Sequence, residues 1–489
     1  MLYDNLAAIV ARAPAGNGLR HEGRTQTYAA LLERITRLAA GFRERGVGLG
    51  DPVVILMANG PELFVVLHAL CAIGAIALPL SPGATLAECG FAARKAKARA
   101  VLAQPAQLEL AGALATELGI QLFAAGGDGD NGTATLERNP AASLPSLPGD
   151  TPAFYLSSSG STGLPKIVPH THAELLADAR RTSTAWQLTP DDIVFDMLPP
   201  NFAMGVLLGL TNAAEVGATT VYWNDPRPLA LTRGRLLETL VAERVSFMGA
   251  VPTMYDMLIG AKGADALALR LAFCGGAAMS RALFERFRDR FGVSLRQSYG
   301  STEAIFVAHN DAPDADATWN TVGRPAGDAR ARIALDPDLG DGVGELLLQS
   351  SSMTAGYLDD PVANAASFED GWLRSGDLAR QNADGTLTIT GRLKLLIEVG
   401  GYKIDPLEVE AALLQHPAVA EAVVVGVRDG SYGGPRLKAV IVAADAVDAD
   451  ELTRHLRDRL SSQKVPALFE FRAQLPKSSA GKILRSRVD

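Results

Sequence analysis

The chain has 489 residues, of which 48% are hydrophobic and 20% charged, a length that allows two or three domains with large apolar cores. Its 46 Lys and Arg against 54 Asp and Glu give a net charge of −8, which argues against a nucleic acid or an anionic membrane held by bulk charge. Cys71, Cys89 and Cys274 share no CxxC spacing. They argue against a disulfide framework or a Cys-rich zinc site and favour a reducing, cytoplasmic setting.

The N-terminal residues Met1–Asn5 lack the basic start and apolar stretch of a signal peptide. Only Leu63–Leu80 is apolar enough to be weighed as a membrane span, but it contains His68, Gly74 and Pro79 and lacks flanking Lys/Arg clusters. We interpret it as a buried helix, a turn at Gly74 and a buried strand. No membrane insertion is expected.

Apolar runs rich in Val, Ile and Leu alternate with stretches of helical spacing, such as Tyr28–Arg45 and Ala173–Trp186. This alternation predicts an α/β fold with mainly parallel sheets covered by helices on both faces. Gly126–Pro148, rich in Gly, Asp, Asn and Pro, is expected to be a surface excursion. The clearest strand candidates are Val53–Met57, Ala75–Leu80, Val194–Leu198, Thr219–Trp223 and Val245–Gly249.

The pattern changes near the C-terminus, where short elements predict a small mobile α+β domain. We expect an N-terminal domain over residues 1–392 and a C-terminal domain over residues 393–489. The expected elements are a strand at Thr386–Thr390, a helix at Pro406–Gln415, strands at Val419–Val427 and Lys438–Val442, and a helix at Ala449–Leu460.

An apolar strand, Ala153–Leu156, runs directly into a segment of hydroxyl residues and glycines that ends on Lys166. Hydroxyls, backbone N–H groups and one ammonium can together bind polyphosphate oxygens. A Walker A loop is excluded because Leu-Pro separates Gly163 from Lys166 and no Ser or Thr follows the lysine. A flexible linker is the alternative, disfavoured by the strand that leads in. The candidate phosphate contacts are Ser158, Ser159, Gly160, Ser161, Thr162, Gly163 and Lys166.

Four further motifs follow in order: Gln297–Glu303 (QSYGSTE), Arg374–Asp377 (RSGD), Gly391–Lys394 (GRLK) with Val399–Pro406 (VGGYKIDP), and Pro476–Lys482 (PKSSAGK). With the hydroxyl-rich segment, they resemble the signatures of the adenylate-forming superfamily: acyl-CoA synthetases, aryl-acid ligases, peptide-synthetase adenylation domains and luciferases. Five collinear motifs over nearly the whole chain are a specific signal. The resemblance implies that Mg·ATP activates a small carboxylic acid as acyl-AMP, which then passes to the thiol of coenzyme A or of a phosphopantetheine on a separate acyl carrier protein.

The resemblance also implies roles in nucleotide binding. Tyr299 stacks on adenine, Thr302 contacts the α-phosphate and Glu303 holds Mg²⁺, for which a carboxylate beside phosphate oxygens is a suitable ligand set. Asp377 accepts hydrogen bonds from the ribose hydroxyls, and Arg392 reaches ribose or phosphate. Backbone close to a planar base is allowed by Gly275, Gly276 and Ala277, which follow the expected strand Leu271–Cys274.

Each of these residues has a simpler alternative. Glu303 could be an acid at a helix N-terminus, Asp377 could cap a turn, and Arg392 could be a surface arginine. Gly275 and Gly276 could form an ordinary turn.

Catalysis is assigned by resemblance to Lys482, placed over the α-phosphate and the substrate carboxylate during adenylation. Lys394 matches the hinge position about which the C-terminal domain turns between two half-reactions. Gly400 and Gly401 match a loop lining the thiol tunnel.

The acyl pocket resembles two family segments. In the first, Leu198–Gly205, amino-acid-activating domains place an Asp near the position of Ala203 and dihydroxybenzoate enzymes place an Asn there. Ala203 therefore disfavours an α-amino acid and a catechol acid as substrates. The second, Ala304–Val307, is bulky where hydroxycinnamate ligases carry Gly-Pro-Val. A shallow apolar pocket suits a short, flat acid such as benzoate or a hydroxybenzoate. The candidate lining residues are Phe202, Ala203, Gly205, Ile305 and Val307.

Several readings stay open from the sequence. Phe202 could be core packing. The acid could be a short or medium aliphatic one, the adenylate could pass to an amine, or the chain could be a non-catalytic nucleotide-binding relative. Free coenzyme A and a carrier protein are both open as acceptors, as are a monomer and a homodimer.

Overall fold

The structure is a computed structural model that describes residues 1–141, 143–158, 166–336, 339, 342–399, 402–427, 436–460, 464–477 and 483–488. Its contacts divide the chain into two compact units, Met1–Arg330 with Leu348–Leu373, and Ala331–Leu347 with Arg374–Asp489. The predicted boundary after residue 392 falls within the second unit, because residues 331–347 and 374–392 pair with one another as strands. As a hinge position, that boundary stays a prediction.

A six-stranded sheet forms the first part of unit one, in the order β6-β5-β3-β4-β7-β8. All neighbours are parallel except the last pair. Its strands are β3 (Pro52–Leu56), β4 (Ile76–Pro79), β5 (Ala100–Ala103), β6 (Gln121–Ala124), β7 (Pro152–Ser158) and β8 (Lys166–Thr171). Successive side chains of a strand point to opposite faces, so Val53 packs with α2 (Tyr28–Glu44) and α3 (Pro61–Ala72), and Val54 packs with α4 (Leu86–Ala96) and α5 (Leu108–Leu118).

A nine-stranded sheet forms the rest of this unit, in the order β15-β14-β13-β12-β11-β9-β10-β1-β2. Its central strands are parallel, and β2, β14 and β15 are antiparallel to their neighbours. The bounds are β1 (Gly18–His21), β2 (Arg24–Thr27), β9 (Ile193–Asp196), β10 (Thr219–Tyr222), β11 (Phe247–Ala250), β12 (Leu271–Cys274), β13 (Leu295–Ser301), β14 (Ile305–His309) and β15 (Arg324–Pro325).

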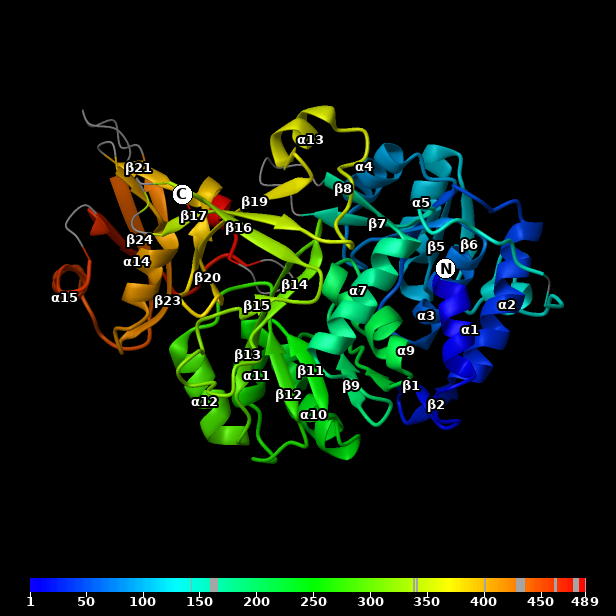
Figure 1. Cartoon of the computed structure of the whole chain (residues 1–489), viewed down its shortest axis with the longest axis horizontal. Helices are drawn as coiled ribbons and strands as arrows, with labels where there is room; N and C mark the ends of the chain where they lie inside the picture. Colours follow the sequence, from blue (N-terminus) through cyan, green and yellow to red (C-terminus); the bar gives the residue numbers. More distant parts are fainter. Residues whose placement is uncertain are drawn as a thin grey trace. The chain divides into compact units, whose positions relative to one another are not determined.

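The two faces of this sheet are covered by different helices (Figure 1). One face packs on α10 (Leu229–Ala242), α11 (Pro252–Ile259) and α12 (Arg281–Phe291). The other face packs on residues that follow α7 (His172–Ala185) and on α9 (Ala213–Val216). The helices α1 (Leu2–Val10) and α8 (Ala203–Leu207), with a π-helical turn at Leu208–Asn212, complete the layer. The predicted α/β fold with mainly parallel sheets is confirmed.

The five strand candidates correspond to β3, β4, β9, β10 and β11, each displaced by at most two residues. Leu63–Leu80 divides into α3 and β4 around Gly74, whose φ of +77° favours glycine. Among the described residues, no helix is both long and apolar enough to cross a membrane.

One expectation needs correction. Gly126–Pro148 is not purely a surface excursion, because it contains the short helix α6 (Thr133–Leu136) and Leu136 is 1% exposed. Leu136 packs against Gly41 of α2, where an added Cβ would lie 2.6 Å from the Leu136 Cβ. Composition alone did not reveal this contact between distant segments.

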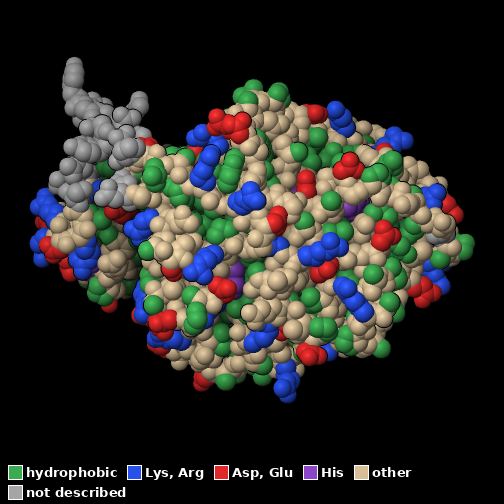
Figure 2. All heavy atoms as spheres, viewed as in Figure 1, with side chains coloured by type: hydrophobic (Ala, Val, Ile, Leu, Met, Phe, Trp, Pro, Cys, Tyr) green, Lys and Arg blue, Asp and Glu red, His purple; other side chains and the backbone are tan. Residues whose placement is uncertain are grey.

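The second unit is α+β, as predicted. Its elements are β16 (Arg330–Leu335), β17 (Val343–Gln349), β19 (Trp372–Gln381), β20 (Leu387–Arg392), β21 (Ile397–Val399), β22 (Tyr402–Ile404), α14 (Pro406–Leu413), β23 (Val419–Val427), β24 (Arg436–Ala443), α15 (Ala449–Arg457) and β25 (Leu468–Phe471). The strands β23, β24 and β25 form a sheet that packs on α14 and α15. Figure 2 shows Lys/Arg and Asp/Glu side chains interspersed over one face of the molecule.

Three buried histidines make folding sensitive to acid. Burial lowers the pKa of His68, His172 and His309 to about 4, below the value of about 6.5 for an exposed histidine. The unfolded chain therefore binds protons more tightly. The stabilisation from each neutral imidazole is complete above pH ~6.5, is lost as the pH falls through about 4, and amounts to about 3 kcal/mol.

We predict that His68→Leu reduces the pH dependence of the free energy of unfolding between pH 6.5 and 4. The reduction should correspond to roughly one proton fewer taken up on unfolding. His68 is 3% exposed and its ring lies 4.2 Å from the Phe64 ring, centroid to centroid, so an apolar replacement suits the site. Urea unfolding of the variant and the parent chain across this pH range measures the slope. Identical slopes would contradict a buried neutral His68.

Candidate active site

The predicted phosphate-binding segment connects two strands that pair with each other. Ser158 ends β7 and Lys166 begins β8, and the two are opposite partners in the antiparallel ladder. Both ends of the segment are therefore fixed to the sheet. The phosphate contacts predicted for Ser159, Gly160, Ser161, Thr162 and Gly163 lie outside the described residues and stay predictions.

Tyr357 links Lys166 to Glu303. The Lys166 ammonium lies 4.0 Å from the centroid of the Tyr357 ring, a cation–π distance. The Tyr357 hydroxyl donates a hydrogen bond to the Glu303 Oε1 at 2.8 Å. Burial, with the Glu303 charge second, raises the pKa of Tyr357, so the hydroxyl stays protonated and able to donate.

Tyr357 is itself held by its backbone. The Asn364 side chain accepts from the Tyr357 N–H at 2.6 Å and donates to its carbonyl at 3.0 Å. Just upstream, the Thr354 N–H donates to the Glu303 carbonyl at 2.9 Å, and its hydroxyl donates to the Pro169 carbonyl at 2.7 Å. This segment thus joins β8 to the turn that carries Glu303.

Glu303 lies in the turn between β13 and β14 and not at a helix N-terminus, which excludes that alternative. The His170 Nε2 donates to the Thr302 carbonyl at 2.8 Å, which fixes the same turn from β8. Among the described residues, no three His, Cys, Asp or Glu side chains gather to hold a metal. Mg²⁺ often binds one carboxylate together with substrate phosphates, so Glu303 fits the proposed role.

The predicted adenine segment follows β12, as expected. Gly276 has φ +75°, and a Cβ added to Gly275 would lie 3.2 Å from the Ser298 carbonyl of β13. Tyr299 lies on β13, in the next strand of the sheet, and is 9% exposed. The glycines therefore allow close packing of the two backbones beside Tyr299.

In the second unit, Asp377 and Arg392 face each other across β19 and β20. The Arg392 Nε donates to the Asp377 Oδ1 at 2.5 Å, and the Asp377 side chain is 7% exposed against 49% for Arg392. Asp377 lies in a strand, so it does not cap a turn. Glu345 of β17 binds Arg374 and accepts from the Gly376 N–H at 3.2 Å, which fixes the RSGD motif.

The remaining residues of the second unit are only partly placed. Lys394 lies in a 3₁₀ turn, Leu393–Leu395, whereas Lys482, Gly400 and Gly401 lie outside the described residues. The residues on either side of the Lys482 segment form defined contacts. Lys477 and Ile483 form an antiparallel β-bridge. The Arg485 Nη1 and Nη2 donate to the Oε1 and Oε2 of the buried Glu410 at 2.5 and 2.6 Å.

The two predicted acyl-pocket segments contribute to the same apolar clusters of unit one. Ala203 and Ile305 pack in one apolar cluster, and Met204 and Phe306 pack in a second. Phe202 is 44% exposed, so it is not core packing.

Two other candidates of the acyl pocket are buried. Gly205 is needed for packing, since a Cβ there would lie 2.2 Å from the Pro199 carbonyl. Val307 is 1% exposed.

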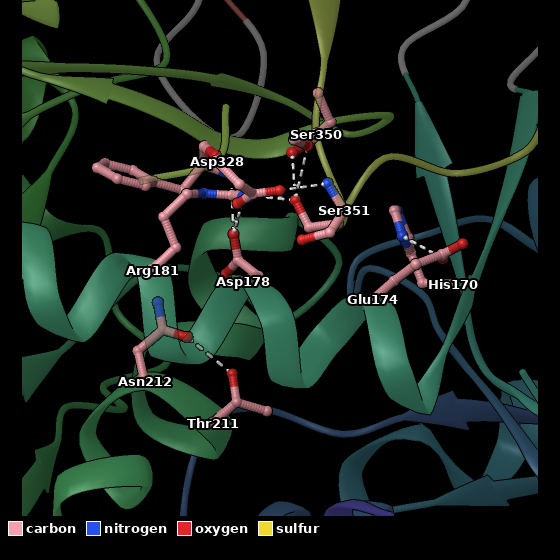
Figure 3. A network of polar contacts seen from close by, with 12 residues as sticks. His170, Glu174, Asp178, Arg181, Thr211, Asn212, Asp328, Ser350 and Ser351 are labelled. Atoms are coloured by element: carbon pink, nitrogen blue, oxygen red, sulfur yellow. Dashed lines mark hydrogen bonds and ion pairs between the residues drawn. The ribbon is translucent and has the colours of Figure 1, made fainter. Parts of the chain in front are cut away.

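Sequence reasoning missed Tyr357 and the two residues that contact the backbone beside Ile305, Asp178 and Arg181. Ile305 has φ +56°, a left-handed conformation that costs a non-glycine residue of order 1–3 kcal/mol. Asp178 and Arg181 project from α7 (Figure 3). Both form hydrogen bonds with the backbone of the residue after Ile305, Phe306. The only sequence signal was an Asp and an Arg three residues apart on a predicted helix, a spacing equally typical of a surface ion pair.

Two family models match the chain: AMP-binding enzyme over residues 5–358 and AMP-binding enzyme C-terminal domain over residues 408–482. The chain belongs to this family of adenylate-forming enzymes. It is an AMP-forming ligase that joins an acid to a thiol, and ATP and coenzyme A are the co-substrates of this class.

Individual relatives cover nearly the whole chain. The feruloyl-CoA synthase of Amycolatopsis sp. is 33% identical over 494 residues, 97% of this chain and 96% of that protein. The sulfoacetate–CoA ligase of Cupriavidus necator is 30% identical over 505 residues, 100% and 98% of the two chains. The solved benzoate CoA ligase of Burkholderia xenovorans LB400 is 27% identical with a TM-score of 0.89, over 100% of this chain and 99% of that one.

We predict that Tyr357→Phe raises the KM for Mg·ATP about tenfold, because one hydrogen bond to a charged group is lost while the ring below Lys166 is kept. Tyr357→Leu should raise it further, since the cation–π contact is lost as well. ATP–pyrophosphate exchange measures both. Equal values for the parent chain and Tyr357→Phe would show that the hydroxyl does not position Glu303.

Proposed function

We propose that the enzyme activates a small aromatic acid, benzoate or a hydroxybenzoate, and transfers the acyl group to coenzyme A. The observation that carries the chemistry is the connected set Lys166, Tyr357 and Glu303, which places an ammonium and a carboxylate around one phenol. The observation that favours a flat acid is the exposed Phe202 ring at the start of α8, whose next residue, Ala203, packs in one cluster with Ile305.

The first half-reaction forms a mixed anhydride. A carboxylate oxygen of the acid attacks the α-phosphorus of ATP, the bond to the β-phosphate oxygen breaks, and pyrophosphate leaves. Positioning and neutralisation of charge are the main demands of such a displacement. Lys166 and the hydroxyl-rich segment would bind phosphate oxygens, and Thr302 would contact the α-phosphate. Mg²⁺ held by Glu303 would neutralise phosphate charge.

Base and ribose binding would come from residues of β13, β19 and β20 and from the segment after β12. Tyr299 would stack on adenine beside Gly275, Gly276 and Ala277. Asp377 would accept from the ribose hydroxyls, and Arg392, paired with Asp377, would orient that carboxylate as well as reach ribose or phosphate.

In the second half-reaction the thiol sulfur attacks the acyl carbonyl and AMP leaves. Lys482 would act only in the first step. Lys394 would be the hinge that withdraws it, and Gly400 and Gly401 would line the thiol tunnel. Sequestering the adenylate from water is a reason for such a domain movement.

The acid is tested by ATP–pyrophosphate exchange with benzoic, hydroxybenzoic, cinnamic, sulfoacetic, fatty and amino acids. We expect exchange with one or a few small aromatic acids, because the proposed walls Phe202, Ile305 and Val307 are apolar and bulky. Exchange confined to aliphatic acids would keep the mechanism and favour the second candidate, an aliphatic acyl-CoA synthetase. Binding of ATP without exchange for any acid would favour a non-catalytic relative.

We predict that Lys482→Ala lowers adenylation about 10²–10³-fold, the loss typical of one group that stabilises developing charge. Thioester formation from a supplied acyl-adenylate should stay within about twofold. Lys464→Ala is the matched control, since Lys464 pairs with Glu408 elsewhere in the second unit. Equal loss of both half-reactions would contradict a role for Lys482 in the first step alone. Coenzyme A and a pantetheine-bearing carrier protein are compared as acceptors in the same assay.

A further inference from the structure

Ile305 adopts a backbone conformation that its side chain disfavours. Its φ is +56°, and a β-branched residue in this region is a genuine outlier. The side chain is 6% exposed and packs in the cluster that contains Ala203. Such a conformation persists only where the surroundings impose it.

Polar side chains form hydrogen bonds with the backbone of the residues on both sides of Ile305. The Phe306 N–H donates to the Asp178 Oδ1 at 3.1 Å, and the Arg181 Nη2 donates to the Phe306 carbonyl at 2.6 Å. On the other side, the Ser352 hydroxyl donates to the Ala304 carbonyl at 3.0 Å. The residues before and after Ile305 are thus both fixed by groups from outside the strand.

These contacts replace a missing neighbour strand. One edge of β14 pairs with β13. The other edge pairs with β15 at Ala308 and His309, and the N–H of the residue after β15, Ala326, donates to the Val307 carbonyl at 2.9 Å. At Phe306 that second edge meets α7, from which Asp178 and Arg181 project (Figure 3). A carboxylate takes the place of the strand carbonyl and a guanidinium that of the strand N–H.

The pair is buried and built into a larger network. The side chains of Asp178 and Arg181 are 0% and 3% exposed. Among the described residues, the Asp178 Oδ2 and the Arg181 Nε have no hydrogen-bond partner, so burial of this ion pair carries a cost that its other contacts only partly offset. Arg181 also donates to Asp328 at 3.0 Å and to the Ser352 hydroxyl. The other oxygen of Asp328 accepts from the Ser351 N–H at 2.7 Å. One guanidinium therefore joins α7, β14 and the segment that contains Ser351 and Ser352.

We propose that Asp178, Arg181, Asp328 and Ser352, here called the Arg181 network, hold Ile305 in its left-handed conformation and thereby set which acids the enzyme accepts. Ile305 is the specificity-determining residue and the network residues are positioning residues. Glu303 lies two residues before Ile305, in the turn that leads into β14, so the network also fixes the position of Glu303. This inference rests on the proposed function for its acid-binding part.

The test compares the parent chain with Ile305→Gly, Arg181→Lys and the double variant. Glycine adopts φ +56° without strain and removes the side chain. Lysine keeps the buried charge but lacks the planar fork that reaches Asp328, Ser352 and Phe306 together. Arg180→Lys is the matched control, because Arg180 is the adjacent arginine of α7 with a side chain that is 64% exposed.

The first readout is the ratio of kcat/KM for a two-carbon-longer acid, such as cinnamic against benzoic acid, in pyrophosphate exchange. We expect Ile305→Gly to raise this ratio roughly tenfold or more, Arg181→Lys to raise it roughly threefold or more, and Arg180→Lys to leave it within twofold. A merely structural role would lower the rates for all acids together. An unchanged ratio in both Ile305→Gly and Arg181→Lys would overturn the proposal.

The second readout is the KM for Mg·ATP, which reports whether the turn keeps Glu303 in position. Arg181→Lys should raise it roughly threefold or more in the parent chain and by less than twofold in the Ile305→Gly background. Glycine at position 305 adopts the left-handed conformation without strain. Loss of the network should therefore leave the turn, and Glu303 within it, close to the original position. Equal increases in both backgrounds would overturn the coupling.

A urea-unfolding cycle over the same four proteins separates this inference from the proposed function. Arg181→Lys should raise the equilibrium constant for unfolding by a smaller factor when Ile305 is present, because loss of the network then also releases the strain at Ile305. If no acid supports exchange, the proposed function fails. If Arg181→Lys changes the unfolding equilibrium constant by the same factor in the parent chain and in the Ile305→Gly variant, the network role is overturned as well. Should Arg181→Lys fail to fold, Ser352→Ala takes its place in each comparison, because it removes the bond to Ala304 without removing a charge.

Discussion

The proposed chemistry of this enzyme depends on one constraint: the turn from Thr302 to Phe306 must keep a fixed position. Its side chains are proposed to serve two different substrates, with Glu303 on the nucleotide and Ile305 on the acid. The fold secures the turn from three directions, through His170 of β8, Tyr357 of the following segment and Arg181 of α7. Parallel strands suit this arrangement, because their carboxyl ends bring loops from distant segments to one edge.

Much of this fold follows from local sequence pattern. Continuous apolar runs predicted the buried strands β3, β4, β9, β10 and β11, since strands covered on both faces are apolar throughout. Gly74 divides Leu63–Leu80 into a helix and a strand because only glycine adopts that turn readily. The ladder also pairs Ser158 with Lys166 and Asp377 with Arg392, so two of the predicted motif sets lie on neighbouring strands.

The rest depends on contacts between residues far apart in the chain. Tyr357 lies 54 residues from Glu303, and Arg181 lies 125 residues from Phe306. Neither residue has a periodic neighbour pattern that would mark it. Leu136 lies in Gly126–Pro148, which was expected to be a surface excursion because it is rich in Gly, Asp, Asn and Pro, yet Leu136 is buried against Gly41. The pairing of residues 331–347 with residues 374–392 as strands, which places both in the second unit, is likewise not visible in a linear sequence.

The central claim is that a carboxylate of the substrate attacks the α-phosphorus of ATP. It is tested most directly with an acid labelled with ¹⁸O in both carboxylate oxygens, under full turnover with ATP and coenzyme A. Since that oxygen bridges the acyl group and the phosphorus in the adenylate, one ¹⁸O atom should appear in AMP and none in pyrophosphate, as mass spectrometry of the products would show. Label in inorganic phosphate, with ADP as the nucleotide product, would contradict the account.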